Sequence, residues 1–136
     1  AALEDGTLDA IGTDHAPHAE SKKSLGVVKA PFGAIGMETA FPVLYTRLVL
    51  RGRLSLRRLV EALVTGPARV ARRTPATLAV GAPARIAVVD VTTERTVDRT
   101  RLRSKSRNCP FDGMRLTGWP VATVVGGDVR TFSPGR

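Results

Sequence analysis

Apolar residues recur at helical spacing twice in the first half of the chain. The first stripe consists of Met37, Ala40, Phe41, Leu44, Tyr45 and Leu48, and the second of Leu56, Leu59, Val60, Leu63 and Val64. Steps of three and four residues place such side chains on one face of a helix. Gly52 ends the first stripe, Ser55 offers an N-cap for the second, and Pro67 suits the first turn of a short helix through Val70. The pattern therefore predicts three helices between residues 36 and 70.

The other apolar runs are short and rich in β-branched residues, which predicts strands. These runs are residues 8–13, 85–91, 121–125 and 128–132. We expect the first to be a buried strand that ends in a polar loop. Gly126 and Gly127 predict a two-residue hairpin turn before the last strand, because glycine permits positive φ. Residues 19–34 are expected to form a loop, and residues 94–118 a polar and irregular segment.

These elements do not make a complete fold. One strand and a few amphipathic helices cannot bury their own apolar faces, and the strands of the second half are likewise only part of a sheet. We therefore expect the chain to be the end of something larger. Its 136 residues contain no run of about 18 apolar residues of the kind a membrane-spanning helix needs. Cys109 is the only cysteine, which excludes a disulfide scaffold and a cysteine-rich zinc module. By elimination, we expect a cytoplasmic protein with no membrane partner.

The formal charge of +9 raises the question of nucleic-acid binding. Arginine supplies 17 of the 21 basic residues, concentrated in residues 47–73 and 94–107, whereas residues 1–20 carry five acids and no Lys or Arg. A basic surface attracts anions of any kind. Proteins that bind single strands usually add aromatic side chains for base stacking, and neither basic stretch has one between its arginines. The charge therefore favours a solvated face, and no nucleic-acid partner is expected.

The densest cluster of reactive side chains follows the first predicted strand. Asp14, His15 and His18 lie within five residues, and a carboxylate with imidazoles can bind a divalent metal or move protons. Spacing alone favours an Asx-type turn before Pro17, with both histidines as ordinary loop side chains. The chain has no other histidine, so a complete metal shell cannot be assembled from it.

Several blocks of the sequence resemble the dihydroorotases, a group of cyclic amidohydrolases. The blocks are Ile11-Gly12-Thr13-Asp14-His15-Ala16-Pro17-His18, the run from Lys29 to Pro42, Leu54-Ser55-Leu56, Gly66-Pro67-Ala68-Arg69, Val80-Gly81-Ala82, Ser104-Lys105-Ser106-Arg107-Asn108, Pro110-Phe111, and the run from Gly118 to Gly127. They cover nearly the whole chain in the order of the family. Gly66 departs from the pattern, because the family usually has Asn there.

The resemblance implies the C-terminal part of a longer α/β enzyme with a metal-dependent (β/α)₈ TIM barrel and a small β-sandwich domain. Residues 1–75 would be the last strand, active-site loop and helices of the barrel, and residues 76–136 the C-terminal part of the small β domain. The implied reaction is the reversible cyclisation of N-carbamoyl-L-aspartate to dihydroorotate in pyrimidine biosynthesis. The other metal ligands would lie upstream, so we expect the chain to be inactive by itself.

The resemblance also implies roles for individual residues. Asp14 would be the metal ligand and the proton shuttle, and His18 would bind the substrate carboxylate. Phe32 and Gly33 would line the substrate, although a core Phe and a turn Gly fit the same sequence. His15 could orient Asp14 or merely hold the loop. The implied cofactor is Zn²⁺, with two ions in the complete enzyme.

Two alternative interpretations of the function stay open. One is another cyclic amidohydrolase, an allantoinase or a dihydropyrimidinase, which generally lacks a histidine matching His18. The other is a non-catalytic dihydroorotase-like subunit that scaffolds aspartate transcarbamoylase. We expect a homo-oligomer, which could also associate with aspartate transcarbamoylase. The predicted small-molecule partners are N-carbamoyl-aspartate and dihydroorotate.

Overall fold

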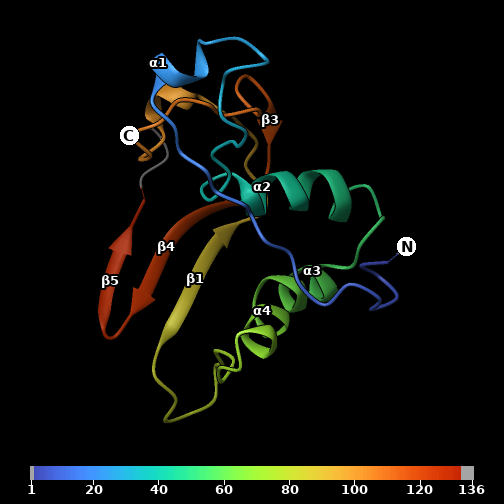
Figure 1. Ribbon diagram of the computed structural model, residues 1–136. Helices are drawn as coiled ribbons and strands as arrows, with labels where there is room; N and C mark the ends of the chain where they lie inside the picture. The colour runs from blue at the N-terminus through green and yellow to red at the C-terminus, as the bar shows by residue number, and fades with distance from the viewer. Residues whose placement is uncertain (1, 133–136) are drawn as a thin grey trace.

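Short helices fill the first half of the chain, and strands fill the second (Figure 1). The computed structural model describes residues 2–132. The helical segments are α1 (Glu20–Lys23), α2 (Ala40–Leu44), the π-helical turn η1 (Tyr45–Val49), α3 (Leu56–Leu63), α4 (Thr65–Val70) and the 3₁₀ turn η2 (Arg99–Arg101). The strands are β1 (Arg85–Asp90), β2 (Arg95–Thr96), β3 (Arg115–Leu116), β4 (Trp119–Val125) and β5 (Asp128–Thr131). Within residues 2–132, no helix is long and apolar enough to cross a bilayer.

The first apolar stripe forms α2 and η1, which confirms the predicted helix. Tyr45, Leu54 and Leu59 are the buried centre of a cluster that partly buried apolar residues surround. The rings of Phe41 and Tyr45 stack with their centroids 5.8 Å apart. The amide of Leu50 donates to the carbonyl of Tyr45, at 3.0 Å, and this five-residue step widens the helix into a π turn.

The second stripe forms α3, and Ser55 caps it as predicted. The Ser55 hydroxyl accepts a hydrogen bond from the amide of Arg58 at 3.2 Å, which satisfies one of the free donors of the first turn. Leu59 and Ala62 on the inner face of α3 are fully buried. The predicted short helix after it is α4, which ends at Val70 as expected.

The prediction of a buried strand at residues 8–13 is wrong. Those residues have no strand partner in the described chain, and most of them are exposed. The amide of Ile11 instead donates to the carbonyl of Ala62 at 2.9 Å, at the end of α3. A Cβ on Gly66 of α4 would lie 1.9 Å from the carbonyl oxygen of Asp9, so glycine permits this close approach. A strand needs a hydrogen-bonded neighbour, which the described residues do not provide for this segment.

The predicted hairpin is confirmed within a three-stranded antiparallel sheet of order β1-β4-β5. Gly126 and Gly127 turn the chain between β4 and β5 with φ of 59° and 92°. The register of β1 against β4 shifts between Val88 and Val89, and Val89 lies opposite Pro120. Proline has no amide proton for a ladder, so an irregular position tolerates it best.

Residues 94–118 are more ordered than their polar sequence predicts. They hold β2 and β3, which pair with each other, and the turn η2. Val97 and Leu116 are almost completely buried within this stretch. Isolated apolar residues among arginines form no periodic pattern, which explains why the sequence predicted an irregular segment here.

The helical and β-rich halves are joined by direct hydrogen bonds. The Thr46 hydroxyl accepts from the amide of Thr117 at 2.8 Å and lies 3.1 Å from the carbonyl of Thr117, to which it donates. The Glu38 carboxylate accepts from the amides of Arg103 and Ser104 at 2.8 and 3.0 Å. These bonds hold the segment from Arg103 to Thr117 against Glu38, just before α2, and against Thr46 of η1. Residues of this segment lie at the end of the molecule that also carries α1 (Figure 1).

Candidate functional site

Asp14 has an unusual backbone conformation and a carboxylate that no described residue hydrogen-bonds. Its φ of 44° lies in the left-handed region, where Asp is tolerated better than most side chains. The residue is exposed, and no group among residues 2–132 hydrogen-bonds its carboxylate. A strained residue with a free acidic group is typical of functional loops. Both oxygens are therefore available to a metal, a substrate or a proton.

His15 holds the loop in place through its ring. Its Nδ1 atom lies 3.2 Å from the amide nitrogens of Gly36 and Met37, which can only donate. Nδ1 is therefore unprotonated, and the proton of the neutral ring resides on Nε2. The amide of Ala16 also donates to the carbonyl of Ala34 at 2.9 Å, beside the parallel bridge between His15 and Ala34. Of the two roles expected for His15, the structure shows the loop-holding one.

His18 is fixed at one ring nitrogen and open at the other. Its Nε2 atom lies 2.9 Å from the carbonyl oxygen of Phe32 and donates to it. No group among the described residues hydrogen-bonds Nδ1 of the half-buried ring. An imidazole bound in this way presents Nδ1 to any ligand that arrives.

Phe32 and Gly33 meet the Asp14–His18 loop through their backbone. The Phe32 side chain is 94% exposed, so it is not the core anchor that its sequence also allowed. Gly33 has a φ of 113°, and a Cβ placed on it would lie 2.4 Å from Cβ of Ala16. Glycine is therefore required for the close approach of these two segments. His18, Phe32 and Gly33 therefore meet in one region, and Asp14 stands on the same loop, four residues before His18.

Three further side chains build this region, and the sequence did not single them out. Lys23 of α1 donates from Nζ to the carbonyls of Pro31 and Gly33, at 3.0 and 3.1 Å. Ser106 and Asn108 reach the same loops from the β-rich half. Their only signal in the sequence was that Ser106 and Asn108 lie within a block that resembles the family.

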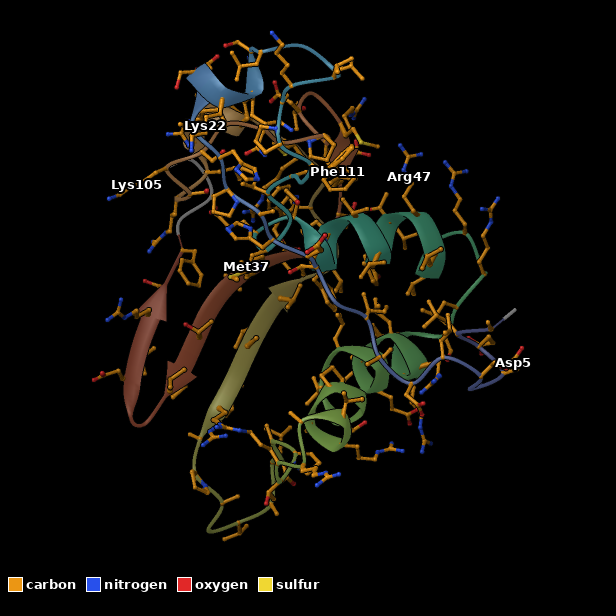
Figure 2. The ribbon with its side chains drawn as sticks, viewed as in Figure 1. Asp5, Lys22, Met37, Arg47, Lys105 and Phe111 are labelled. Atoms are coloured by element: carbon orange, nitrogen blue, oxygen red, sulfur yellow. The ribbon has the colours of Figure 1, made fainter. Side chains whose placement is uncertain are left out.

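The surroundings of His18 are basic. Lys23 lies close by, and the half-buried guanidinium of Arg107 donates to the carbonyls of Leu102 and Ser104, at 3.0 and 2.6 Å. Lys22 and Lys105 project from the same end of the molecule (Figure 2). A cluster of this sign favours an anionic ligand. Two cavities of about 700 and 550 Å³ lie elsewhere, beside β2 and η2, and neither is lined by the predicted site residues.

The described residues fit a metal only as part of a shell. No group of three or more His, Cys, Asp or Glu side chains in residues 2–132 is arranged to hold a metal ion. The ring nitrogen Nδ1 of His15 is occupied by backbone amides, and Nε2 of His18 by a carbonyl. The free carboxylate of Asp14 suits a hard or borderline cation, so this chain can supply one oxygen ligand to an ion completed by other residues.

The chain belongs to the amidohydrolase family, whose model matches residues 1–130. It is 49% identical over 129 residues to a dihydroorotase from Brevibacillus brevis, an alignment that covers 95% of this chain and 30% of that protein. It is 50% identical over 125 residues to a dihydroorotase from Bacillus caldolyticus, with 92% of this chain and 29% of that protein covered. The chain thus spans about 30% of the length of these curated relatives.

Solved structures with the same arrangement include hydantoinases. The L-hydantoinase (dihydropyrimidinase) from Arthrobacter aurescens superimposes with a TM-score of 0.87 at 38% identity. The alignment covers 97% of this chain and 32% of the hydantoinase chain. The D-hydantoinase (dihydropyrimidinase) from a Thermus species gives a TM-score of 0.84 at 31% identity, with 96% and 30% covered. The fold of this chain is therefore found within larger amidohydrolases.

Proposed function

We propose that this chain acts as the C-terminal part of a dihydroorotase, which interconverts N-carbamoyl-L-aspartate and dihydroorotate in pyrimidine biosynthesis. The observation that carries the proposal is the contact of the Asp14–His18 loop with the Phe32-Gly33 backbone in one basic region. A free carboxylate on the same loop as an imidazole suits a substrate that carries both a cleavable ring amide and a carboxylate. Identity of about 50% to dihydroorotases over more than nine-tenths of the chain supports this choice.

The complete protein, in this proposal, is a metal-dependent (β/α)₈ barrel with a small β-sandwich domain. Residues 1–75 supply the last strand of the barrel with its loop and helices, and residues 76–136 supply part of the β domain. Segment 8–13 has no strand partner among the described residues, and neighbouring strands of a complete barrel would provide one, which supports this assignment. The overlap with about a third of each hydantoinase agrees with it.

The residues of this chain have distinct tasks in the proposed reaction. In the hydrolytic direction, water adds to the ring carbonyl carbon while the bond between that carbon and the ring nitrogen breaks. Asp14 accepts the proton lost by the water and delivers it to the departing nitrogen, so the same carboxylate serves as base and then as acid. His18 holds the substrate carboxylate through Nδ1, and the backbone at Gly33 closes the site against the Asp14 loop.

The proposed cofactor is Zn²⁺, for which Asp14 would be one ligand and upstream residues the others. When bound, zinc lowers the pKa of water and polarises the carbonyl oxygen of the substrate. Two ions are proposed for the complete enzyme. Metal analysis of the purified full-length protein, with and without the substitution Asp14→Asn, would measure how much of the metal depends on this carboxylate.

The hydantoinase structures favour a second candidate, a dihydropyrimidinase. The two candidates differ in the substrate, because dihydroorotate carries a ring carboxylate, whereas dihydrouracil does not. The Nδ1 atom of His18, which no described residue hydrogen-bonds and which lies in a basic region, supports the substrate with the carboxylate. Identity to the dihydroorotases is also higher than to the hydantoinases.

The test is a substrate comparison with the full-length, zinc-loaded protein. We expect turnover of dihydroorotate and of N-carbamoyl-aspartate, and a kcat/KM at least a hundredfold lower for dihydrouracil and hydantoin. A preference for the ring without a carboxylate would replace the proposal with the second candidate. No turnover of either, with intact folding, would favour the non-catalytic subunit. Light scattering with and without aspartate transcarbamoylase would test the proposed homo-oligomer and that partnership.

A further inference from the structure

Ser106 brings the β-rich half of the chain into contact with the candidate site. Its side chain lies in a buried position, 88 residues beyond His18. The hydroxyl donates to the carbonyl of His18 at 2.8 Å and accepts from the amide of the same residue at 3.3 Å. Its oxygen also contacts Oδ1 of Asn108. Both main-chain groups of His18 are therefore held by one side chain from a distant segment.

Asn108 connects the two loops that form the site. Its Nδ2 atom donates to the carbonyl of Ala16 at 3.2 Å and to the carbonyl of Gly33 at 3.1 Å. The carbonyl of Asn108 accepts from the amide of Ile35 at 3.1 Å. A carboxamide has two N–H donors on one nitrogen, which matches two carbonyl acceptors on opposite segments. A carboxylate of the same shape would present only oxygen atoms to both carbonyls.

These contacts extend to the ring of His18. Gly33, held by Asn108, directly follows Phe32, whose carbonyl oxygen fixes Nε2 of His18. The Asp14 end of the loop has a separate support, because His15 binds the amides of Gly36 and Met37. A change at Asn108 therefore acts on the His18 side of the site more than on the Asp14 side.

We propose that Asn108, assisted by Ser106, is a positioning residue that sets the orientation of His18 toward the substrate carboxylate. The proposal rests on the proposed dihydroorotase function. Asn108 contacts no substrate itself, and it determines how tightly the substrate is held rather than how fast the proton moves. A change at Asn108 should therefore raise KM and leave kcat almost unchanged, whereas a change at a purely structural residue should not affect KM selectively.

The test uses the full-length enzyme with the substitutions Asn108→Ala, Asn108→Asp and Asn108→Gln. We expect Asn108→Ala and Asn108→Asp to raise KM for dihydroorotate at least tenfold and to change kcat less than threefold. Asn108→Gln keeps both donors, so its KM should lie between those of the wild type and Asn108→Ala. Ser104→Ala is the matched control, because Ser104 lies in the same segment and, among the described residues, its hydroxyl hydrogen-bonds only with the amide of Ser106.

Other outcomes overturn the proposal. An unchanged KM in Asn108→Ala would do so, as would a loss of kcat and thermal stability at constant KM, which is the signature of a merely structural residue. If Asn108→Ala does not fold, Ser106→Ala replaces it, with an expected rise in KM of threefold or more; no rise would contradict the proposal.

Hydrogen exchange separates this proposal from the proposed function. If the wild-type enzyme does not act on dihydroorotate, the proposed function is wrong. The rate of amide hydrogen exchange in residues 13–18 and 31–36 then tests the positioning role of Asn108 independently. Faster exchange of both segments in Asn108→Ala than in Ser104→Ala supports it. Equal exchange in the two variants overturns it.

Discussion

The ring of His18 donates to the backbone oxygen of Phe32 across 2.9 Å, and this bond determines which ring nitrogen is left for a ligand. With the proton of the neutral ring on Nε2, the Nδ1 atom can only accept. To donate to a carboxylate, the ring must therefore carry a second proton. In the proposed complex, Nδ1 would therefore donate only from a doubly protonated ring, and the interaction would be a charge-assisted hydrogen bond.

His18→Gln should separate the two functions of the ring. The Gln amide can replace Nε2 at the Phe32 carbonyl, but it offers neither the charge nor the donor at Nδ1. A hydrogen bond to a charged group contributes about 1.5–3 kcal/mol, so KM for dihydroorotate should rise about 10- to 100-fold. Steady-state kinetics with dihydroorotate measure this change in KM, and kcat should change far less than KM.

Asp14→Asn should remove the proposed proton shuttle without straining the backbone. Asn tolerates the left-handed conformation that Asp14 adopts at φ 44°, whereas Asp14→Ala adds roughly 1–2 kcal/mol of strain. We expect kcat to fall about 10²- to 10⁴-fold in Asp14→Asn, with a melting temperature within about 2 °C of the wild type. Retention of more than a tenth of the wild-type kcat would contradict the assigned role.

Gly33→Ala should force the two loops of the site apart. The new Cβ would lie 2.4 Å from Cβ of Ala16, so an overpacking cost of about 1–3 kcal/mol adds to the strain of a positive φ. Gly81→Ala is the matched control, because Gly81 has a φ of 84° and no atom within 4 Å of the added Cβ. Denaturant unfolding should show the larger loss for Gly33→Ala. In a double-mutant cycle, Ala16→Gly should recover part of that loss, and strict additivity of the two changes would be evidence against the contact.

The turn after β1 should make stability depend on pH through Asp90. Hydrogen bonds from Thr93 and Thr92 hold the pKa of the Asp90 carboxyl well below its ordinary value of 3.8. A lowered folded-state pKa stabilises the fold above the unfolded-state value, and this contribution is lost as the pH falls toward the folded-state value. Asp90→Asn should therefore lower the melting temperature equally at pH 7 and pH 5, and the difference should shrink below pH 4.

Local patterns in the sequence predicted most of the regular elements. The apolar stripes that contain Tyr45 and Leu59 form the buried faces of helices, as predicted. Ser55 caps α3, because the start of a helix depends on a few neighbouring residues. The hairpin at Gly126 is equally local. Segment 8–13 was predicted wrongly because a strand depends on neighbours, which its own residues cannot supply.

The candidate site was predictable only in part. Asp14, His18 and Gly33 could be found because they stand in short motifs that resemble a family. The roles of the Phe32 carbonyl, which fixes His18, and of the Asn108 side-chain amide, which joins the two loops, could not be predicted. Both depend on backbone carbonyl groups, which every residue has. Asn108 stands in an arginine-rich stretch 75 residues beyond Gly33, and no local pattern shows that a single amide spans that distance.

The hydrogen bonds between Thr46 and Thr117 bear on how this sequence could be recombined with those of its relatives. Thr46 contributes its hydroxyl, whereas Thr117 contributes only its main-chain N–H and C=O. At this junction, a chimera with a crossover between the two positions needs the hydroxyl from its N-terminal parent. The C-terminal parent can supply any residue except proline, which has no N–H to donate. The requirement at this junction therefore falls on the N-terminal parent alone. A library of chimeras that keeps Thr46 fixed can take its C-terminal halves from divergent sequences without losing these two hydrogen bonds.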